Sequence, residues 1–372
     1  MGKHLVLAGS GHAHLFILSN LGEIRERGHQ VTVVSPSDFY YHPGMGPGVL
    51  GGSHRLDAIR FATRHAVEKN GGRFISGYIK KADPQQRIVI LDTGESISYD
   101  AISFCVGSRV PRDILIEEGE AIVPIKPIEN LLRARAILLN LLSTSEKPVV
   151  ASVVGGGPSA CEIAGNLFQA AKRHGGQSLL IHLFAGQMLL ERFPDRGRGV
   201  VRQILAGRGI EIVENSYVTE VKQDAVILDP NQNWPSDLTL IASGLKPVPI
   251  FKRSGLTIGP EGALPVSCFL QNPEYPEIFG GGDCIYLEKG GVDKVWIGAM
   301  RQGRVLFHNL MAFMEGRPLK PFDPMGNDLL ALNLGDKTGL LMGKNRIYHG
   351  YIAFLVKEFF DKRFMRTFKA MK

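Results

Sequence analysis

The hydrophobic pattern at the start of the chain predicts a strand, a tight turn and a helix. Residues 4–8 form a short apolar run of the kind found in buried parallel strands. Gly9-Ser10-Gly11 ends this run, and residues 12–18 have a helical pattern. In such a unit the first glycine permits the turn, the second lets a pyrophosphate approach the backbone, and the helix N-terminus supplies N–H groups. The segment therefore predicts a phosphate-binding turn, although His14 stands where Gly or Ala is usual.

A second unit of the same kind lies about 145 residues further along the chain. Residues 149–154 form an apolar run, a turn rich in glycine follows from Gly155, and residues 161–173 are predicted to be helical. Here the small third position is filled, by Ala160. One such turn is a weak signal, but two of them, each after an apolar strand, predict two dinucleotide-binding domains.

The pattern between the two glycine turns predicts mostly short strands. Residues 30–34 read as a β-branched strand, which is followed by Ser35 where an acidic residue would usually bind a ribose. Residues 36–48 are rich in aromatics, Gly and Pro, so we expect a ligand-facing loop without helix. A helix and three antiparallel strands are expected next, over residues 57–70, 73–80, 87–92 and 96–99. Two strands that each begin at Asp and close in a Gly followed three or four residues later by Pro, at 100–111 and 237–247, mark the expected crossings between the domains.

Composition narrows the function classes. The 372 residues are 44% hydrophobic and 21% charged, as in ordinary globular proteins, and the length favours two or three domains. The four cysteines form no Cys-x-x-Cys pair and the histidines no His-x-x-x-His pair, so neither a redox disulfide nor a metal site is expected. The first strand leaves no room for a signal peptide and no apolar run could span a bilayer, which favours a cytoplasmic protein. The net charge of +7 comes without a nucleic-acid recognition motif, so nucleic acid is not an expected partner.

The basic excess is concentrated in a C-terminal helical pattern over residues 352–372. Lys362, Arg366 and Lys369 lie opposite a broad apolar arc, which Lys357 and Arg363 interrupt. The arc contains Ile352, Leu355, Val356, Phe359, Phe360, Phe364, Phe368 and Met371. A basic amphipathic helix of this kind suits the surface of an anionic membrane, as on the inner face of the cytoplasmic membrane. The alternative is a helix that packs on the protein's own core or in a homodimer.

These features together resemble the flavoproteins with two dinucleotide-binding domains, the pyridine nucleotide-disulfide oxidoreductase superfamily. The glycine turns, the crossing strands and the segment 278–284 occur in the order of that superfamily. The chain is most similar to the oxidoreductase module fused ahead of selenide, water dikinase in some bacteria, and more distantly to type II NADH:quinone and sulfide:quinone oxidoreductases. The segments that carry this likeness are 9–14, 44–48, 125–128, 299–303 and 360–365.

The resemblance implies an α/β fold with two Rossmann-like domains, the second inserted in the first. Residues 1–112 and 248–332 would form an FAD-binding domain, 113–247 an NAD(P)-binding-like domain, and 333–372 a C-terminal membrane-docking or dimerisation segment. A helix over 299–309 would point its N-terminus at the flavin, with Trp296-Ile297 in place of the Ala-Gln pair of quinone reductases. The cofactor-binding residues expected on this basis are Gly9, Gly11, His12, Ala13, Ser35, Pro43, Ile79, Val106, Gly107, Gly155, Gly157, Gly244, Gly282, Asp283 and Ala299.

The nucleotide specificity of the second unit stays open. Its second strand, predicted over residues 178–184, is followed by no acidic residue that would select an NAD ribose. Arg192, Arg196 and Arg198 come next, and they are either contacts for a 2′-phosphate or solvated surface charges. NAD(P)H is therefore an expectation from the fold rather than from specific residues.

The activity implied by the resemblance is FAD-dependent electron transfer from NAD(P)H to a quinone-like acceptor. One alternative is oxidation of sulfide or another chalcogen through Cys268, although Cys161, the candidate partner, falls inside a predicted helix. Another is a flavin-binding protein without turnover. The candidate catalytic residues are Cys268, Gln302 and Lys126.

Overall fold

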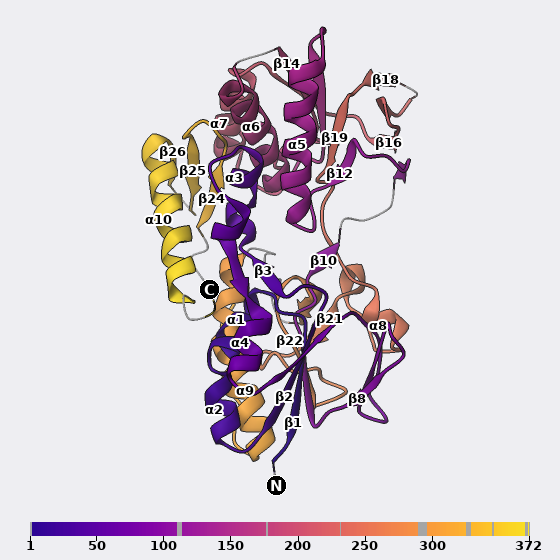
Figure 1. Ribbon diagram of the computed structural model, residues 1–372, viewed down its shortest axis with the longest axis vertical. Helices are drawn as coiled ribbons and strands as arrows, with labels where there is room; N and C mark the ends of the chain where they lie inside the picture. Colours follow the sequence, from indigo (N-terminus) through magenta and orange to yellow (C-terminus); the bar gives the residue numbers. More distant parts are fainter. Residues whose placement is uncertain are drawn as a thin grey trace.

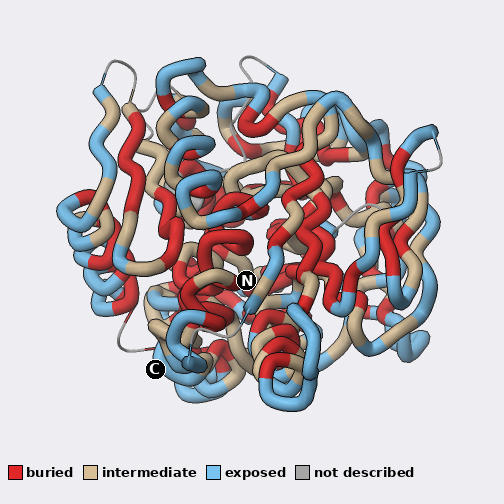
Figure 2. The backbone as a smooth tube through the Cα atoms, turned by 90° about the horizontal axis from the view of Figure 1, so that it is seen from above, coloured by how far each residue is buried: buried red, intermediate tan, exposed pale blue. Residues whose placement is uncertain are grey.

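The structure, a computed structural model, describes residues 2–109, 114–175, 178–230, 232–288, 296–324, 329–343, 346–368 and 371. Its two α/β halves are stacked along the long axis, with the N-terminal half at the bottom of Figure 1 and the middle of the chain at the top. In Figure 2 the buried segments gather in the interior of the molecule, and most exposed segments lie at its periphery. The predicted fold class, two Rossmann-like units followed by a C-terminal helical segment, is confirmed. The proposed domain boundaries stay predictions, and the one at 112/113 lies outside the described residues.

The first half is built on a parallel sheet whose central strand carries the first glycine turn. Its central strands are almost completely buried, which explains why they read as nearly continuous apolar runs. The strand order is β22 (Ile278–Gly280), β9 (Ala101–Phe104), β1 (His4–Ala8), β2 (Gln30–Ser35) and β5 (Arg73–Ser76). The helices of this half are α1 (His12–Ser19), α2 (Leu21–Glu26), α4 (Thr63–Lys69), α8 (Ile250–Arg253) and α9 (Trp296–Glu315).

The second half repeats this design with a second parallel sheet. The strand order is β12 (Ile122–Pro124), β19 (Leu238–Ile241), β13 (Val149–Val154), β14 (Leu179–Phe184) and β15 (Ile210–Val213). Its helices are α5 (Glu129–Thr144), α6 (Pro158–Arg173) and α7 (Asp195–Ala206). A smaller sheet beside it contains β11 (Leu115–Ile116), β16 (Val218–Val221), β17 (Ala225–Leu228) and β18 (Gln232–Pro235).

The two crossing segments predicted from the sequence pair with each other. β10 (Ser108–Arg109) is antiparallel to β20 (Lys246–Pro247), so the chain leaves and re-enters the first half at one place. The remaining strands form small sheets in the first half: β3 (Phe39–Tyr41) with β4 (Arg60–Ala62), β21 (Leu264–Val266) with β23 (Ile285–Leu287), and β6 (Ile79–Asp83), β7 (Ile88–Leu91) and β8 (Ser96–Ser98) together.

Two predictions for the segment after β2 are wrong. Residues 57–70 do not form one helix: a 3₁₀ turn (Leu56–Ile59) and β4 precede α4. The reason is tertiary, because β4 pairs with the aromatic strand β3 and buries Phe61 completely. The expected loop 36–48 likewise ends in the 3₁₀ turn Pro43–Met45 and the helix α3 (Gly46–Leu50). Proline is tolerated in the first turn of a helix, and Gly46 lets this one approach Ile128 of the second half closely.

Two further boundaries differ from expectation. Residues 73–80 were expected to form one antiparallel strand, but β5 joins the main sheet in parallel to β2 and ends before Gly77, whose φ is +156°. The helix expected over 299–309 extends in both directions as α9 and begins at Trp296. Strand β5 ends before Gly77 because few L side chains adopt the backbone conformation found there.

The C-terminal segment connects the two halves. A three-stranded sheet of β24 (Leu330–Asn333), β25 (Gly339–Met342) and β26 (Ile347–Gly350) packs on α6, where an added Cβ on Gly165 would lie 2.0 Å from the Leu334 carbonyl oxygen. Helix α10 (Tyr351–Thr367) then runs along one side of the molecule, yellow in Figure 1, toward the first half. No helix among the described residues combines the length and the apolar character that crossing a membrane requires.

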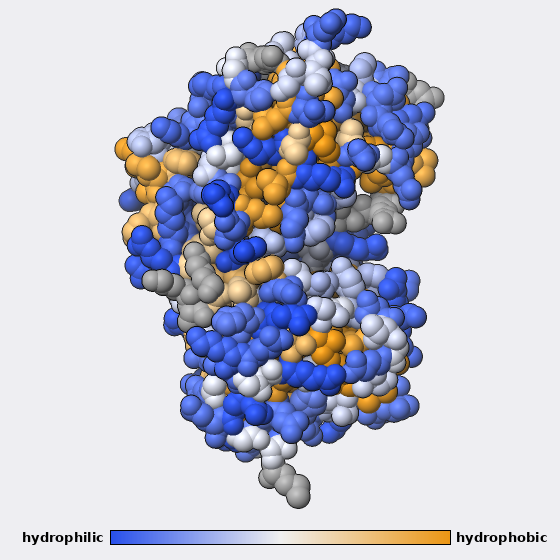
Figure 3. Space-filling view, viewed as in Figure 1, coloured by the Kyte–Doolittle hydropathy of each residue, from blue (hydrophilic) through white to orange (hydrophobic). Residues whose placement is uncertain are grey.

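Helix α10 does not bury the face that its apolar pattern suggests. Phe364 and Phe368 pack against Phe61 in the core of the first half, as expected for part of the arc. Met371 of the arc is buried as well, but Ile352, Leu355, Phe359 and Phe360 are exposed. The buried residues of α10 include charged ones instead: Lys357, Glu358 and Asp361. The large apolar residues exposed on or beside this helix are Tyr348, Tyr351, Ile352, Leu355, Phe359 and Phe360. They form an apolar patch over α10, seen at the left edge of Figure 3.

Candidate functional site

The first glycine turn lies at the carboxyl end of β1. Gly9 has φ +86°, and an added Cβ there would lie 2.3 Å from the Cys105 carbonyl oxygen. A Cβ on Gly11, the N-cap of α1, would lie 2.7 Å from the Cys105 Sγ. Both glycines are therefore needed for the turn to pack on the end of β9. This packing places the N-terminal end of α1 at the sheet edge where dinucleotide phosphates bind in such folds.

His14, at the third position of the fingerprint, has a structural role. Its Nδ1 lies 2.7 Å from the Gly9 carbonyl oxygen and its Nε2 lies 2.8 Å from the Ser103 hydroxyl. The imidazole thus connects the turn to β9, which a glycine or alanine could not do. Burial lowers the pKa of His14 to about 4, so the ring is neutral near pH 7. At this position a Gly or Ala would allow the helix and strand to pack closely, whereas His14 joins them through two hydrogen bonds.

The other strand ends of this sheet meet the first turn at one edge. Val106 and Gly107 follow β9, and Gly282 follows β22. Gly107 and Gly282 have φ of +69° and +77°, and a Cβ on Gly107 would meet no atom within 4 Å. Ser35 ends β2, and its hydroxyl lies 3.0 Å from the Ser10 hydroxyl. The structure thus brings most of the predicted FAD residues of this half together at the carboxyl edge of the sheet.

Four predicted cofactor residues lie in other surroundings. Ala13 is buried behind the turn, where it packs against Gly281, and Ala299 is buried in the first turn of α9. Pro43 begins the 3₁₀ turn after β3. Ile79 is half-buried in β6, two residues after Gly77, whose N–H donates to the Ser35 carbonyl oxygen. Ala13 and Ala299 therefore contribute to packing, whereas Pro43 and Ile79 lie on segments that leave the end of β2.

Asp283 connects three segments of the chain. The Ser108 hydroxyl donates a 2.8 Å hydrogen bond to its carboxylate, and the Lys126 ammonium lies 3.4 Å from the same oxygen. Lys126 also donates to the Ser108 hydroxyl at 3.0 Å. Both charged side chains are about a quarter exposed, at 28% for Lys126 and 25% for Asp283. The predicted catalytic Lys126 is therefore joined to the predicted cofactor residue Asp283, at the junction of the two halves.

Gln302 holds the turn before Asp283. Its Oε1 accepts a 2.7 Å hydrogen bond from the Gly282 N–H, and the side chain is fully buried. Its Nε2 is buried and has no hydrogen-bond partner among the described residues. An unpaired amide donor beside this glycine turn fits an oxygen-rich ligand, because a buried polar group without a partner is costly. Gln302 is therefore placed to orient the Gly282 turn and to donate to a bound group.

A buried chain of polar side chains, which the sequence did not reveal, leads from the turn to α10. The Tyr40 hydroxyl lies 2.5 Å from His12 Nδ1, and His12 Nε2 lies 3.4 Å from His42 Nδ1. His42 Nε2 lies 2.9 Å from the Asp361 carboxylate, whose other oxygen accepts a 2.7 Å hydrogen bond from Lys357. Lys357 also donates to the Gly44 carbonyl oxygen. The only signal in the sequence was Lys357 itself, a charge that interrupts the apolar arc.

Burial and neighbouring charges determine the ionisation of this chain. Burial lowers the pKa of both His12 and His42, although Asp361 opposes this at each ring. Burial would raise the pKa of Asp361, but Lys357 and His42 outweigh it and hold that pKa well below its usual range. Burial would lower the pKa of Lys357, and the carboxylates of Asp361 and Glu162 raise it instead. The chain thus combines neutral rings with an ionised Lys–Asp pair.

The second glycine turn also lies between a central strand and a helix, and its first glycine also has a positive φ. Gly155 has φ +142°, and a Cβ there would lie 2.3 Å from the Ala242 carbonyl oxygen at the end of β19. Gly157 caps α6, and Gly244 has φ +76°; a Cβ on either would meet no atom within 4 Å. These glycines leave an open cradle at the carboxyl edge of the second sheet. Of the predicted 2′-phosphate arginines, Arg192 and Arg196 are exposed, whereas Arg198 is bonded to Asp195 and Met188.

The cysteines do not form a reactive pair. Cys105, Cys161 and Cys284 are buried, and burial raises the pKa of each thiol, to about 12 for Cys284. Cys268 is exposed and lies in a turn after β21. Its backbone carbonyl oxygen accepts a hydrogen bond from the Phe322 N–H. No group of three His, Cys, Asp or Glu side chains in the described ranges is placed to hold a metal ion.

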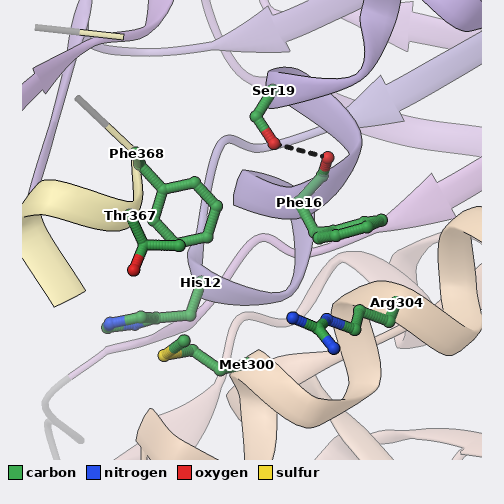
Figure 4. Close-up of a pocket in the computed structure, with 7 residues that line it drawn as sticks. All are labelled: His12, Phe16, Ser19, Met300, Arg304, Thr367 and Phe368. Atoms are coloured by element: carbon green, nitrogen blue, oxygen red, sulfur yellow. Dashed lines mark hydrogen bonds between the residues drawn. The ribbon is translucent and has the colours of Figure 1, made fainter. Parts of the chain in front are cut away.

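A cavity of about 160 Å³ lies between α1, α9 and the end of α10. In Figure 4 the rings of Phe16 and Phe368 and the guanidinium of Arg304 face this space, whereas the ring nitrogens of His12 point away from it. Its remaining lining residues are Ser19, Met300 and Thr367. Its volume is close to that of a protein cavity known to bind benzene.

The first edge fits FAD. The turn at Gly9 and Gly11 and the open position of Gly107 leave space for a dinucleotide, and Gln302 offers an unpaired donor. The partly exposed carboxylate of Asp283 is an acceptor that suits hydroxyl groups at this edge. Two cradles of this kind in one chain suit FAD in the first half and a nicotinamide nucleotide in the second.

Comparisons with known proteins agree with this geometry. Residues 3–303 match the family model described as pyridine nucleotide-disulphide oxidoreductase. The chain is 23% identical to demethylphylloquinone reductase NdbB of Synechocystis, over 95% of this chain and 90% of that protein. It is 22% identical to a probable NADH dehydrogenase of Dictyostelium discoideum, over 95% and 83% of the two chains. The fold superposes on sulfide:quinone oxidoreductase of Aquifex aeolicus with a TM-score of 0.84 at 19% identity, covering 100% and 92% of the chains.

Proposed function

The chain belongs to the pyridine nucleotide-disulphide oxidoreductase family, and we propose that it transfers electrons from NAD(P)H through FAD to a quinone-like acceptor. The observation that carries this proposal is the pair of glycine cradles, one at the carboxyl edge of each parallel sheet. The names of the two sequence relatives, a quinone reductase and an NADH dehydrogenase, support the same donor and acceptor classes. Membership of the family does not by itself specify the electron acceptor, so the quinone assignment depends on these relatives.

The residues of the first edge have distinct tasks in this reaction. FAD, when bound, supplies the two-electron chemistry. Gly9 and Gly11 let its phosphates reach the N-terminal end of α1, and Asp283 binds its hydroxyl groups. Lys126 and Ser108 fix the Asp283 carboxylate through the contacts described above. The second cradle holds the nicotinamide nucleotide, and the β10–β20 pairing keeps the two halves in register.

The acceptor reaches the protein from a membrane surface in this proposal. The exposed apolar patch of α10 adjoins basic residues such as Lys362 and Arg366, which suits an anionic lipid surface. The cavity between α1, α9 and the end of α10 lies at one end of this patch and accepts a ring. We infer peripheral attachment to the inner face of the cytoplasmic membrane, with a homodimer interface on the same patch as the competing use.

The proposal is tested by following the flavin spectrum of the purified protein. FAD should co-purify, and anaerobic NADH or NADPH should bleach its absorbance within seconds. A water-soluble quinone should then restore the colour. A colourless protein that does not take up FAD contradicts the proposal as a whole, whereas bound FAD that neither nucleotide reduces contradicts the assignment of the donor.

Oxidation of sulfide remains a second candidate because the structural neighbour from Aquifex aeolicus has that name. The geometry gives it less support, since Cys268 is exposed and the other three thiols are buried with raised pKa values. A nucleophilic sulfur needs the thiolate form. Adding sulfide in place of the nucleotide in the same experiment separates the two candidates.

A further inference from the structure

The buried chain Tyr40–His12–His42–Asp361 leads from the FAD edge to the C-terminal helix. His12 is the first residue of α1, directly after the glycine turn. Tyr40 lies within electrostatic reach of Asp283 and Cys105, which add to the effect of burial in raising its pKa. Asp361 lies on α10 and is 1% exposed. The chain therefore joins the cofactor edge to a residue more than three hundred positions away in the sequence.

The ionised Asp361 fixes the direction of every hydrogen bond in this chain. A carboxylate only accepts, so His42 donates from Nε2 and its Nδ1 is left as an acceptor. His12 Nε2 then donates to His42, and His12 Nδ1 accepts from the Tyr40 hydroxyl. Lys357 holds the other Asp361 oxygen, which keeps the carboxylate in place. Because the Tyr40 hydroxyl donates its proton to His12, the Tyr40 oxygen can only accept a hydrogen bond from the cofactor edge.

A single proton on His42 reverses this order. Doubly protonated His42 donates from Nδ1 as well, so His12 Nε2 becomes the acceptor and His12 Nδ1 carries the proton. His12 then donates to the Tyr40 oxygen, and the Tyr40 hydroxyl proton is free to turn toward the cofactor edge. One proton therefore converts Tyr40 from an acceptor into a donor without moving any heavy atom.

We propose that His42 takes up one proton when the bound flavin is reduced, and that Asp361 is the positioning residue that orients the His42 ring for this uptake. This inference rests on the proposed function. The nicotinamide supplies two electrons and one proton as hydride, and the proton on His42 comes from solvent. Negative charge gained at the cofactor edge favours a protonated His42 and a donating Tyr40, and the proton leaves again when the flavin is reoxidised.

Among the residues that the structure describes, the other charged groups that act on the two rings are not hydrogen-bonded in the chain between Tyr40 and Asp361. Lys357 and His54 face His42, and both oppose its protonation. Lys126 and His42 face His12 and lower its pKa, whereas Asp361 raises it. Glu162 and Glu358 act on Lys357. Asp361 is the carboxylate whose oxygen contacts the His42 ring, so it controls the response.

The test compares Asp361→Asn with Glu358→Gln. In Asp361→Asn the Lys357 ammonium holds the oxygen of the new amide, so the amide NH₂ faces His42 and imposes the reversed order without a proton. Glu358→Gln is the matched control, because Glu358 lies on the same helix and is hydrogen-bonded to a different histidine, His54, at 2.9 Å.

The measurement is the equilibrium of flavin reduction against a reference dye between pH 6 and 8. Each additional proton taken up makes the reduction constant change tenfold more per pH unit. We expect this additional tenfold dependence in the wild type and in Glu358→Gln, and its loss in Asp361→Asn and His42→Asn. Equal pH dependence in all four proteins overturns the inference while leaving the proposed function intact.

A second measurement does not depend on turnover. Nitrogen NMR of the imidazole rings reports which nitrogen of His12 and His42 carries the proton. The wild type should carry it on Nε2 of both rings, and Asp361→Asn should carry it on Nδ1. Unchanged tautomers in Asp361→Asn overturn the inference, and failure of the wild type to bind FAD overturns it together with the proposed function.

Discussion

The ammonium of Lys126 lies 3.4 Å from the carboxylate of Asp283, although the two residues belong to different halves of the molecule. Lys126 follows β12 of the second sheet, and Asp283 follows β22 of the first. Ser108, in the crossing strand β10, lies between them and bonds to both. The position of the Asp283 carboxylate therefore depends on how the two halves are joined, and a change on either side of the crossing should affect it.

Replacing Asp283 should weaken FAD binding. A hydrogen bond to a charged group contributes about 1.5–3 kcal/mol, so Asp283→Ala should retain FAD roughly 10- to 150-fold less tightly. Lys126→Met should have a smaller effect, because Ser108 still donates to the carboxylate. Equilibrium dialysis of the purified variants measures both. Asp57→Ala is the control, since Asp57 is exposed and pairs with Arg55 at the surface; unchanged FAD affinity in Asp283→Ala would move the site elsewhere.

Sequence patterns predicted the parts of the fold that local chemistry determines. Both glycine turns, their strands and helices, and the crossing segments follow from apolar runs and from glycines with positive φ. The strand β4 could not be predicted, because only the distant aromatic strand β3 gives residues 60–62 a pairing partner. The same limit applies to the site. The contact of His42 with Asp361 joins residues 319 positions apart, and no local pattern marks such a pair.

Removing the His14 ring should destabilise the protein without touching the ligand side of the turn. His14→Ala leaves the Gly9 carbonyl oxygen and the Ser103 hydroxyl buried without their partner, at about 1–3 kcal/mol each. Urea unfolding should therefore show a loss of at least about 2 kcal/mol, and the vacated volume adds to it. His65→Ala, at an exposed position of α4, should change the unfolding free energy by less than about 0.5 kcal/mol. Equal stability of the two variants would mean that the ring is not part of the turn's support.

The donor can be identified with one cysteine variant. If NAD(P)H is the donor, the rate at which it bleaches the flavin should be unchanged in Cys268→Ser, because hydride transfer needs no thiolate. If sulfide is the donor, bleaching should require Cys268, since a thiol is a poor nucleophile and a hydroxyl is poorer. Stopped-flow absorbance with NADH, NADPH and sulfide in turn distinguishes these results. Fast reduction by sulfide that disappears in Cys268→Ser reverses the ranking of the two functions.

The exposed patch of α10 is tested by substitution rather than by deletion of the helix. Deletion would also remove Phe364 and Phe368 from the core, and so would confuse stability with docking. Ile352 and Phe359 are 75% and 58% exposed, so Ile352→Ser with Phe359→Ser should leave the unfolding free energy nearly unchanged.

Binding of this double variant to anionic vesicles should fall by at least tenfold. Each of the two side chains contributes roughly 1.5–3 kcal/mol when fully buried, and the basic residues add a part that salt screens. Sedimentation with vesicles at low and high salt measures both parts. Tyr78→Ser is the control, because Tyr78 is 63% exposed in the other half of the molecule. Vesicle binding that survives the double substitution contradicts membrane docking, and a change from dimer to monomer instead assigns the patch to a subunit interface.

The buried Glu162 should give the protein a specific dependence of stability on pH. Burial raises the pKa of Glu162 to about 7, and the opposing influence of Lys357 and of the Asn333 N–H does not offset it. Between the ordinary pKa of a glutamate, 4.5, and about 7, the folded protein binds more protons at this site than the unfolded chain does. The contribution of Glu162 to stability is therefore fully present below pH 4.5 and is lost as the pH rises through 7.

Glu162→Gln should remove this dependence. The glutamine oxygen can still accept the hydrogen bond from the Asn333 N–H, so the variant loses the titration and keeps the contact. At 1.36 kcal/mol per pKa unit, its stability relative to the wild type should increase by up to about 3 kcal/mol between pH 4.5 and pH 8. Urea unfolding at intervals across this range measures the difference. Glu146→Gln, on an exposed loop, should follow the wild type at every pH. A Glu162→Gln curve parallel to that of the wild type would show that folding does not raise the pKa of Glu162.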